Sequence, residues 1–129
     1  MLALYHGANS VCSIKVRIVL KEKNLEWESR HVDLPKGEQF TPTYLAINPR
    51  AIVPVLNHDG ILIYESSVIC EYLDALSKYN QLLPKSSYDK AKTHVWGIYC
   101  LEYHDSVNTL TFSSYQRKML LDKTFPSIV

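Results

Sequence analysis

Hydrophobic and polar positions alternate in short blocks over the first 32 residues. Residues 2–5 form an apolar run that ends at a histidine and a glycine, which is typical of a buried strand. Residues 12–24 interleave apolar with basic side chains and predict a helix. Three short polar side chains are candidates for its N-cap: Asn9, Ser10 and Ser13. Residues 25–32 alternate like a half-exposed strand, so the order strand-helix-strand predicts a right-handed crossover and a parallel strand pair.

The pattern is broken between residues 33 and 49 by prolines and a glycine, which predict a loop with a short helix around 43–46. Residues 53–56 and 61–64 are two further apolar runs, and the turn between them ends in Asp-Gly. Two strands joined by such a turn predict an antiparallel hairpin.

A second helix is predicted up to Leu76, with Ser66 or Ser67 as its N-cap and Glu65 near the positive end of its dipole. The first 78 residues therefore read strand-helix-strand, loop, strand-strand-helix. This order predicts a mixed sheet with helices on its faces, an α/β fold.

The pattern changes after a linker at 81–87. From Tyr88 to about Phe112 or Tyr115 the spacing is helical, and the segment is rich in aromatic side chains that one lone helix cannot bury. We therefore expect three parts: an α/β domain at 1–80, the linker at 81–87, and the start of an incomplete all-helical domain at 88–129.

Composition and charge exclude several classes of partner. The 129 residues carry 14 Lys and Arg against 13 Asp and Glu, a net charge of +1, which argues against nucleic acid and against a polybasic membrane anchor. No apolar run approaches the roughly 18 residues of a transmembrane helix, and the N-terminus lacks the features of a signal peptide. We therefore expect no membrane partner.

Cysteine and histidine usage indicates a reducing compartment and no metal. Cys12, Cys70 and Cys100 are an odd number at wide spacing, without a zinc pattern or a disulfide framework, so a cytoplasmic protein is expected. The five histidines show no ligand spacing, and solvated or structural roles are expected for them.

Three sequence blocks, in chain order, resemble the glutathione transferase superfamily. They follow a similar opening, Leu4-Tyr5 with Asn9 to Ser13 and Val16-Arg17, and are Ile47 to Arg50 with Val53 to Leu56, then His58 to Gly60, then Glu65 to Leu73. The opening is similar to the zeta-type members and, at Gly7 to Ser10, to the bacterial glutathione-dependent beta-etherases. The resemblance covers about residues 2–78 and implies a thioredoxin-like N-terminal domain. Typical members carry more helices than this chain, so the resemblance implies that it is truncated in the second domain.

Activation of glutathione requires a donor that stabilises its thiolate, because a free thiol has a pKa of about 8.5. The resemblance assigns this role to Ser10, whose hydroxyl would act at a helix N-terminus; an N-cap role is the alternative, and both can coexist. Cys12 is a second candidate, through a mixed disulfide with glutathione, unless it is simply a small residue packed on the sheet. Tyr5 is interpreted as a core or supporting residue.

The remaining site residues come from the resemblance. Val53 and Pro54 match a cis-proline loop whose backbone would pair with the cysteinyl part of glutathione. The alternative interpretation is an ordinary trans proline at the start of an edge strand. Glu65 and Ser66 match the residues of the γ-glutamyl pocket. The alternative is that they only cap the helix that begins there. Gln39 matches a contact to the glycyl end. Lys36 is an alternative contact for the glycyl carboxylate, but solvation is the favoured interpretation for this loop lysine.

Two classes of function follow. The resemblance implies an enzyme, a glutathione transferase that directs the glutathione thiolate at a small hydrophobic electrophile. The aromatic helix from residue 88 favours self-association, so a homodimer is expected. The alternatives are a glutathione-dependent thioltransferase through Cys12, a non-catalytic interaction module of the same fold, or an inactive fragment.

Overall fold

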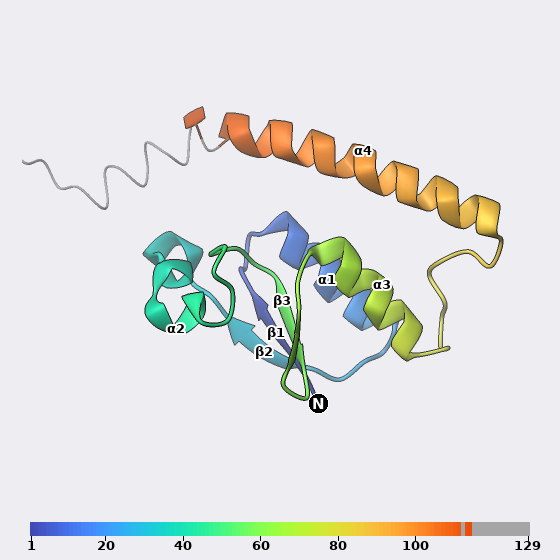
Figure 1. Cartoon of the computed structure of the whole chain (residues 1–129), viewed down its shortest axis with the longest axis horizontal. Coiled ribbons are helices and arrows are strands. Elements are labelled where there is room, and N and C mark those ends of the chain that lie inside the picture. The colour runs from blue at the N-terminus through green and yellow to red at the C-terminus, as the bar shows by residue number, and fades with distance from the viewer. Residues whose placement is uncertain (112, 115–129) are drawn as a thin grey trace, which may run out of the picture. The chain divides into compact units, whose positions relative to one another are not determined.

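The computed structural model describes residues 1–111 and 113–114. It divides the chain into two compact units, Met1–Leu83 and Pro84–Val129 (Figure 1). The first unit contains the whole sheet and three of the α-helices.

The sheet of the first unit has four strands in the order β2-β1-β3-β4. Strands β1 (Leu2–His6) and β2 (Glu28–His31) are parallel, with Ala3 opposite Glu28. Strand β3 (Val55–His58) is antiparallel to β1 and to β4 (Ile61–Ile63). The predicted parallel pair and the predicted hairpin are both confirmed.

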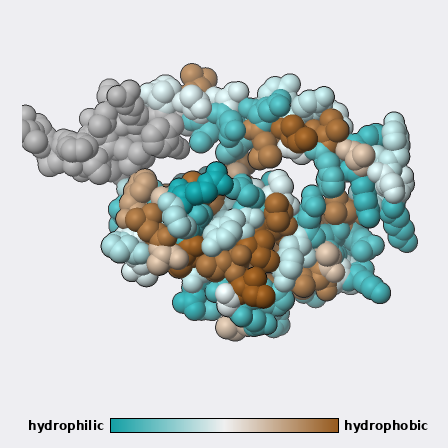
Figure 2. Space-filling view, in the orientation of Figure 1, coloured by the Kyte–Doolittle hydropathy of each residue, from teal (hydrophilic) through white to brown (hydrophobic). Residues whose placement is uncertain are grey.

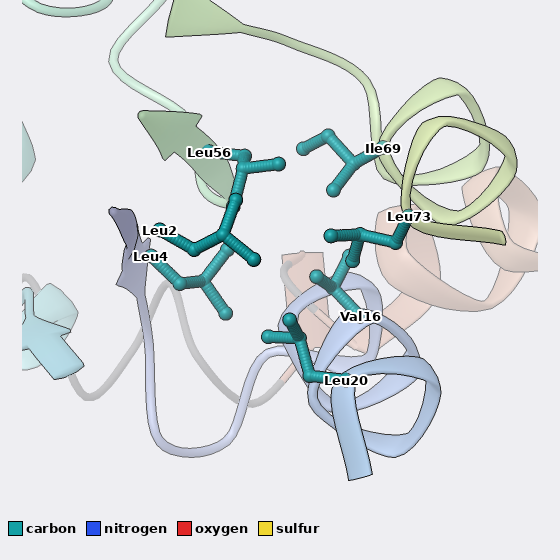
Figure 3. Close-up of a cluster of buried hydrophobic side chains, with 7 residues drawn as sticks. All are labelled: Leu2, Leu4, Val16, Leu20, Leu56, Ile69 and Leu73. Carbon is teal, nitrogen blue, oxygen red and sulfur yellow. The ribbon is translucent and has the colours of Figure 1, made fainter. Parts of the chain in front are cut away.

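Helices α1 (Val11–Glu22) and α3 (Ser66–Leu76) pack on each other and on one face of the sheet. Side chains from the strands and from both helices meet between these layers (Figure 3). The buried cluster consists of Leu2, Leu4, Val16, Leu20, Leu56, Ile69 and Leu73. Val16 and Leu20 are four residues apart and therefore lie on one face of α1, as the helical period requires.

The opposite face of the sheet receives the alternate residues of β1, because successive strand side chains point to opposite sides. Tyr5 lies there and makes an edge-to-face contact with Tyr44, the two ring centroids being 6.3 Å apart. Tyr44 belongs to the short helix α2 (Pro42–Leu45), which begins after the N-cap Thr41. Two 3-10 turns, Leu34–Lys36 and Glu38–Phe40, precede α2. The interpretation of Tyr5 as a supporting residue fits this contact.

Several predicted boundaries differ from the structure, and α1 spans Val11–Glu22 rather than residues 12–24. Strand β2 begins at Glu28 rather than at residue 25. Strand β3 begins at Val55, because Pro54 has no N–H with which to join the ladder. Glu65 occupies the N-cap position of α3 without a side-chain capping bond, so the prediction of Ser66 or Ser67 as the N-cap was wrong; both serines lie inside the first turn.

A buried ion pair links the end of α1 to α3. The Lys23 ammonium, whose side chain is 0% exposed, lies 2.8 Å from Asp74 Oδ1. Asp74 also accepts hydrogen bonds from the N–H groups of Leu82 and Leu83, at 2.9 and 3.1 Å. Burial alone would raise the pKa of Asp74, but these two N–H groups and the Lys23 ammonium together lower it. The pair fixes the chain that follows α3 onto the first unit.

The described part of the second unit is dominated by one helix, α4 (Ser87–Thr111), in which no residue is buried. The helix matches the segment predicted from residue 88; the predicted ends at 112 and 115 lie outside the described residues. No helix among the described residues is long and apolar enough to cross a membrane. The division into residues 1–80, 81–87 and 88–129 stays a prediction.

Candidate functional site

The register of the strands brings the predicted site residues to one end of the sheet. Tyr5, near the end of β1, lies opposite Val55, the first residue of β3. Ile63, the last residue of β4, lies opposite Leu56. The loop after β1, the Val53-Pro54 segment and the start of α3 are therefore neighbours. Strand β2 ends at the same side, because it runs parallel to β1.

Ser10 lies in the loop after β1 as the N-cap of α1, with extended backbone angles. Its Oγ accepts a hydrogen bond from the N–H of Ser13 at 3.3 Å. A hydroxyl has one donor and two acceptor positions, so this cap bond leaves its O–H available. The half-buried Ser10 is thus able both to cap the helix and to donate to a ligand.

The loop that carries Ser10 is held by two contacts that the sequence analysis did not predict. The hydroxyl of Ser13 accepts a hydrogen bond from the N–H of Gly7 at 3.2 Å. Arg17 donates from Nη2 to the carbonyl oxygen of Ala8 at 3.0 Å. Arg17 lies seven residues after Ser10, or two helical turns along α1. Because helical side chains tilt toward the N-terminus, this spacing was the sequence signal that could have predicted its contact with the loop.

Cys12 is the second residue of α1 and is half-buried. No described residue forms a hydrogen bond with its thiol. Three residues further on, Lys15 donates from Nζ to the hydroxyl of Ser67 in α3 at 2.9 Å. Cys70, in α3, has its pKa raised to about 11 by burial, which makes it a poor nucleophile at neutral pH.

The peptide bond between Val53 and Pro54 is cis, as the resemblance implied. The preceding carbonyl, that of Ile52, accepts hydrogen bonds from the Tyr44 hydroxyl at 2.7 Å and from Asn48 Nδ2 at 2.9 Å. Burial raises the pKa of Tyr44 to about 12, so its hydroxyl remains a donor. Among the described residues, no backbone group pairs with the N–H or C=O of Val53. These groups are free to pair with an extended peptide.

Glu65 has a backbone conformation that is rare outside glycine, with φ 64° and ψ 116°. Its side chain does not cap α3; instead its carboxylate pairs with the Arg50 guanidinium. The next residue, Ser66, is buried, and no described residue hydrogen-bonds its hydroxyl. Strained backbone clusters at functional sites, and here it accompanies an acidic side chain and a free hydroxyl at a helix N-terminus.

Gln39 lies in the second 3-10 turn, after β2. Its side-chain oxygen is buried and has no hydrogen-bond partner among the described residues. Buried acceptors normally have a hydrogen-bond partner. Because this oxygen has none among the described residues, it is available to a donor of a bound ligand. Lys36, in contrast, is 78% exposed and lies 2.9 Å from the Asp33 carboxylate, in agreement with the solvated role expected for it.

The described residues contain no group of three or more His, Cys, Asp and Glu side chains that could hold a metal ion. The chemistry at this end of the sheet is instead that of hydroxyl, carboxylate, guanidinium and backbone groups. Such groups recognise a small peptide with a carboxylate and an amine.

Comparison with known proteins identifies relatives of this chain. A family described as glutathione S-transferase, N-terminal domain, matches residues 9–76. The protein LigF of Sphingobium sp. strain SYK-6 is 40% identical over 104 residues, covering 79% of this chain and 40% of LigF. Glutathione S-transferase 1 of Dianthus caryophyllus is 42% identical over 90 residues, covering 70% of this chain and 41% of that protein.

Solved structures give the same result. The crystal structure of the beta-etherase LigF superposes with a TM-score of 0.85 at 36% identity, covering 92% of this chain and 50% of that one. A glutathione transferase homologue from Sulfitobacter, solved with bound glutathione, gives a TM-score of 0.79 at 27% identity, covering 95% of this chain and 61% of that one. The chain thus spans about half the length of these relatives. The thioredoxin-like fold and the resemblance to zeta-type and beta-etherase members are confirmed, and this protein belongs to the glutathione S-transferase family.

Proposed function

We propose that the chain binds glutathione at the end of the sheet where β1 ends and β3 begins, and that it activates the glutathione thiol for attack on an electrophile. The observation that carries this proposal is the convergence there of Ser10, the cis Val53-Pro54 bond and the Glu65-Ser66 pair. Relatives named glutathione S-transferase and a neighbour solved with glutathione support it.

Ser10 would lower the pKa of the bound thiol. Its Oγ already accepts the Ser13 N–H, so its own hydrogen is left to donate to the sulfur. A hydrogen bond to the charged form favours that form, and the positive end of the α1 dipole adds to it. Glutathione then releases its thiol proton to solvent, and the thiolate forms a carbon–sulfur bond as the leaving group departs with its electron pair.

The other residues would hold the tripeptide. The backbone N–H and C=O of Val53 would pair with the cysteinyl residue, as an added strand does. The Glu65 carboxylate would take the α-ammonium, and Ser66 with the N–H groups that begin α3 would take the α-carboxylate. Gln39 would contact the glycyl end.

We propose a small hydrophobic electrophile, and the beta-etherase relative adds ether-like centres to the candidates. The family relationship supports a cytoplasmic homodimer.

The test is a titration of glutathione into the chain by calorimetry, with the ultraviolet absorbance of the thiolate followed against pH. Ser10→Ala should still bind glutathione but lose the fall in thiol pKa, while Ser10→Thr should keep it. The matched control is Ser86→Ala. It removes a similar contact, from the Asp89 N–H to Ser86 Oγ at 3.4 Å, at the start of α4, and should leave thiol acidity unchanged.

Thiol exchange through Cys12 is the second candidate, because this half-buried free thiol lies in the first turn of α1 and forms no hydrogen bond with a described residue. Its thiolate would attack glutathione disulfide, forming a mixed disulfide and releasing one glutathione thiolate. Full thioltransfer in Ser10→Ala and its loss in Cys12→Ala would favour this route. Glutathione binding without activation or exchange would favour a non-catalytic module, and no binding would indicate an inactive fragment.

A further inference from the structure

The side chain of Glu65 is directed by Arg50 rather than by the helix that Glu65 begins. Glu65 occupies the N-cap position, but its carboxylate makes no capping hydrogen bond. The carboxylate instead forms an ion pair with the guanidinium of Arg50, fifteen residues earlier in the chain. Both side chains are open to solvent, at 69% for Arg50 and 52% for Glu65. Solvent-exposed ion pairs contribute little to stability, so a ligand can open this pair at small cost.

The backbone of Arg50 is fixed, although its side chain is exposed. Its N–H donates to Asn48 Oδ1 at 3.1 Å, and the Ala51 N–H donates to the Asn48 carbonyl oxygen at 3.0 Å. Asn48 is itself buried and also binds the carbonyl of Ile52, next to the cis-proline bond. The guanidinium therefore extends toward Glu65 from the same rigid loop that presents Val53.

An exposed pair of opposite charges beside a helix N-terminus matches the two charges of an α-amino acid head group. The ammonium of such a ligand would replace the guanidinium at Glu65, and its carboxylate would pair with Arg50. A guanidinium binds a carboxylate through two parallel hydrogen bonds, which an ammonium side chain cannot do. The buried Ser66, whose hydroxyl has no described partner, lies next to Glu65 in the chain.

We propose that Arg50 is a specificity-determining residue that binds the α-carboxylate of the ligand, so that the site selects peptides with a free α-amino acid terminus. The proposal rests on the proposed glutathione function and adds a residue to its γ-glutamyl end. The competing interpretation is that Arg50 only neutralises Glu65, in which case it hinders the ligand ammonium and its removal tightens binding.

The experiment measures the Kd of two peptides by calorimetry. One is glutathione and the other is γ-aminobutyryl-cysteinyl-glycine, which keeps the amine but lacks the α-carboxylate. The wild-type chain should bind glutathione about tenfold more tightly than the analogue, as expected for one charge-assisted contact. Arg50→Gln should lose about this factor for glutathione and bind the analogue unchanged.

Arg30→Gln is the matched control. Arg30 forms a comparable exposed pair with Glu28 at 2.8 Å, on the edge strand β2, at the other side of the sheet from β4. This variant should bind both peptides like the wild type. Arg50→Lys keeps the charge but not the two parallel donors. Its Kd for glutathione should lie between those of the wild type and Arg50→Gln, and its Kd for the analogue should be unchanged.

Three results would overturn the inference. Arg50→Gln could bind glutathione as tightly as the wild type or more tightly, which would mean that Arg50 does not contact the carboxylate. It could weaken both peptides equally, which would indicate a general effect of charge. If the wild-type chain binds neither peptide, the proposed function fails together with this inference; the first two results leave glutathione binding intact.

Discussion

The first 83 residues bury many of their apolar side chains, whereas α4 leaves its apolar side chains at least partly exposed. In the first unit Leu4, Leu20, Leu56 and Leu73 are completely buried between the sheet and two helices (Figure 3). In α4 no residue is buried, and Trp96 is 66% exposed. Figure 2 shows brown hydrophobic residues on the visible surface of this helix.

The difference shows which part of the protein is determined by its own packing. The residues of the candidate site all belong to the first unit. The α4 helix follows the helical period of its sequence, but a helix gains most of its stability from burial of an apolar face. Its exposed apolar side chains are the kind of surface that promotes association.

The largest difference between the two regions is expected in the unfolding free energy that is lost when an ion pair is broken. Lys23→Met leaves the buried Asp74 carboxylate without its charged partner, which should cost about 3–5 kcal/mol of unfolding free energy. Lys92→Met removes the exposed α4 pair with Asp89, at 3.6 Å, and should cost less than about 1 kcal/mol. Urea unfolding followed by Trp27 fluorescence in a Trp96→Phe background measures both. Equal losses would contradict the comparison.

Leucine truncation should give the next largest contrast. Leu20→Ala opens a cavity in the cluster between the sheet and α1, and should cost about 2–5 kcal/mol. Leu101→Ala changes a 42% exposed side chain in α4 and should alter the free energy of unfolding by about 0.5 kcal/mol or less. Circular dichroism during urea unfolding gives both values. A loss at Leu101 as large as that at Leu20 would show that α4 is packed in solution.

Hydroxyl side chains should differ by a smaller amount. Thr41 caps α2 by accepting the Tyr44 N–H at 3.3 Å, so Thr41→Ala should cost about 1 kcal/mol. Thr93 in α4 only donates to the carbonyl oxygen of Asp89 at 2.9 Å. Thr93→Ala should be neutral or slightly stabilising, because alanine is the better helix former. Thermal unfolding of the two variants compares them directly, and a greater loss at Thr93 would be inconsistent with this account.

The smallest effect is confined to acid pH and belongs to His6 in the first unit. Burial, and then the charges of Arg17 and His31, lower its pKa below the ordinary value of 6.5. The unfolded chain therefore binds the proton more readily, and stability should fall as the pH drops below about 6.5. His6→Gln should reduce this slope in unfolding experiments at several pH values. An unchanged slope would assign the acid sensitivity to another group.

Local patterns predicted most of the first unit. The parallel pair followed from the strand-helix-strand order, and the hairpin followed from its Asp-Gly turn, where Asp59 and Gly60 have positive φ. The N-cap of α3 was mispredicted because serine is the statistically preferred cap. The structure places Glu65 there instead, in an unusual backbone conformation that depends on the surrounding fold.

Contacts between distant residues explain what the sequence could not predict. Lys23 and Asp74 are 51 positions apart, and Arg50 and Glu65 are 15 apart, so no periodicity connects them. A charged residue is usually solvated, and the burial of Lys23 becomes visible only when α1 and α3 are packed together. The pairing of Glu65 with Arg50 likewise depends on how the loop before β3 approaches α3.

The central claim is that glutathione binds where β1 ends and β3 begins. The most direct measurement follows the backbone amide NMR signals of the 129-residue chain during a glutathione titration. The account predicts saturable shifts at Ser10, Val53, Glu65 and Ser66, and little change at the β3–β4 turn, which the pairing of Leu2 with His58 places at the other end of the sheet. Shifts centred on that turn, or none at saturating glutathione, would contradict it.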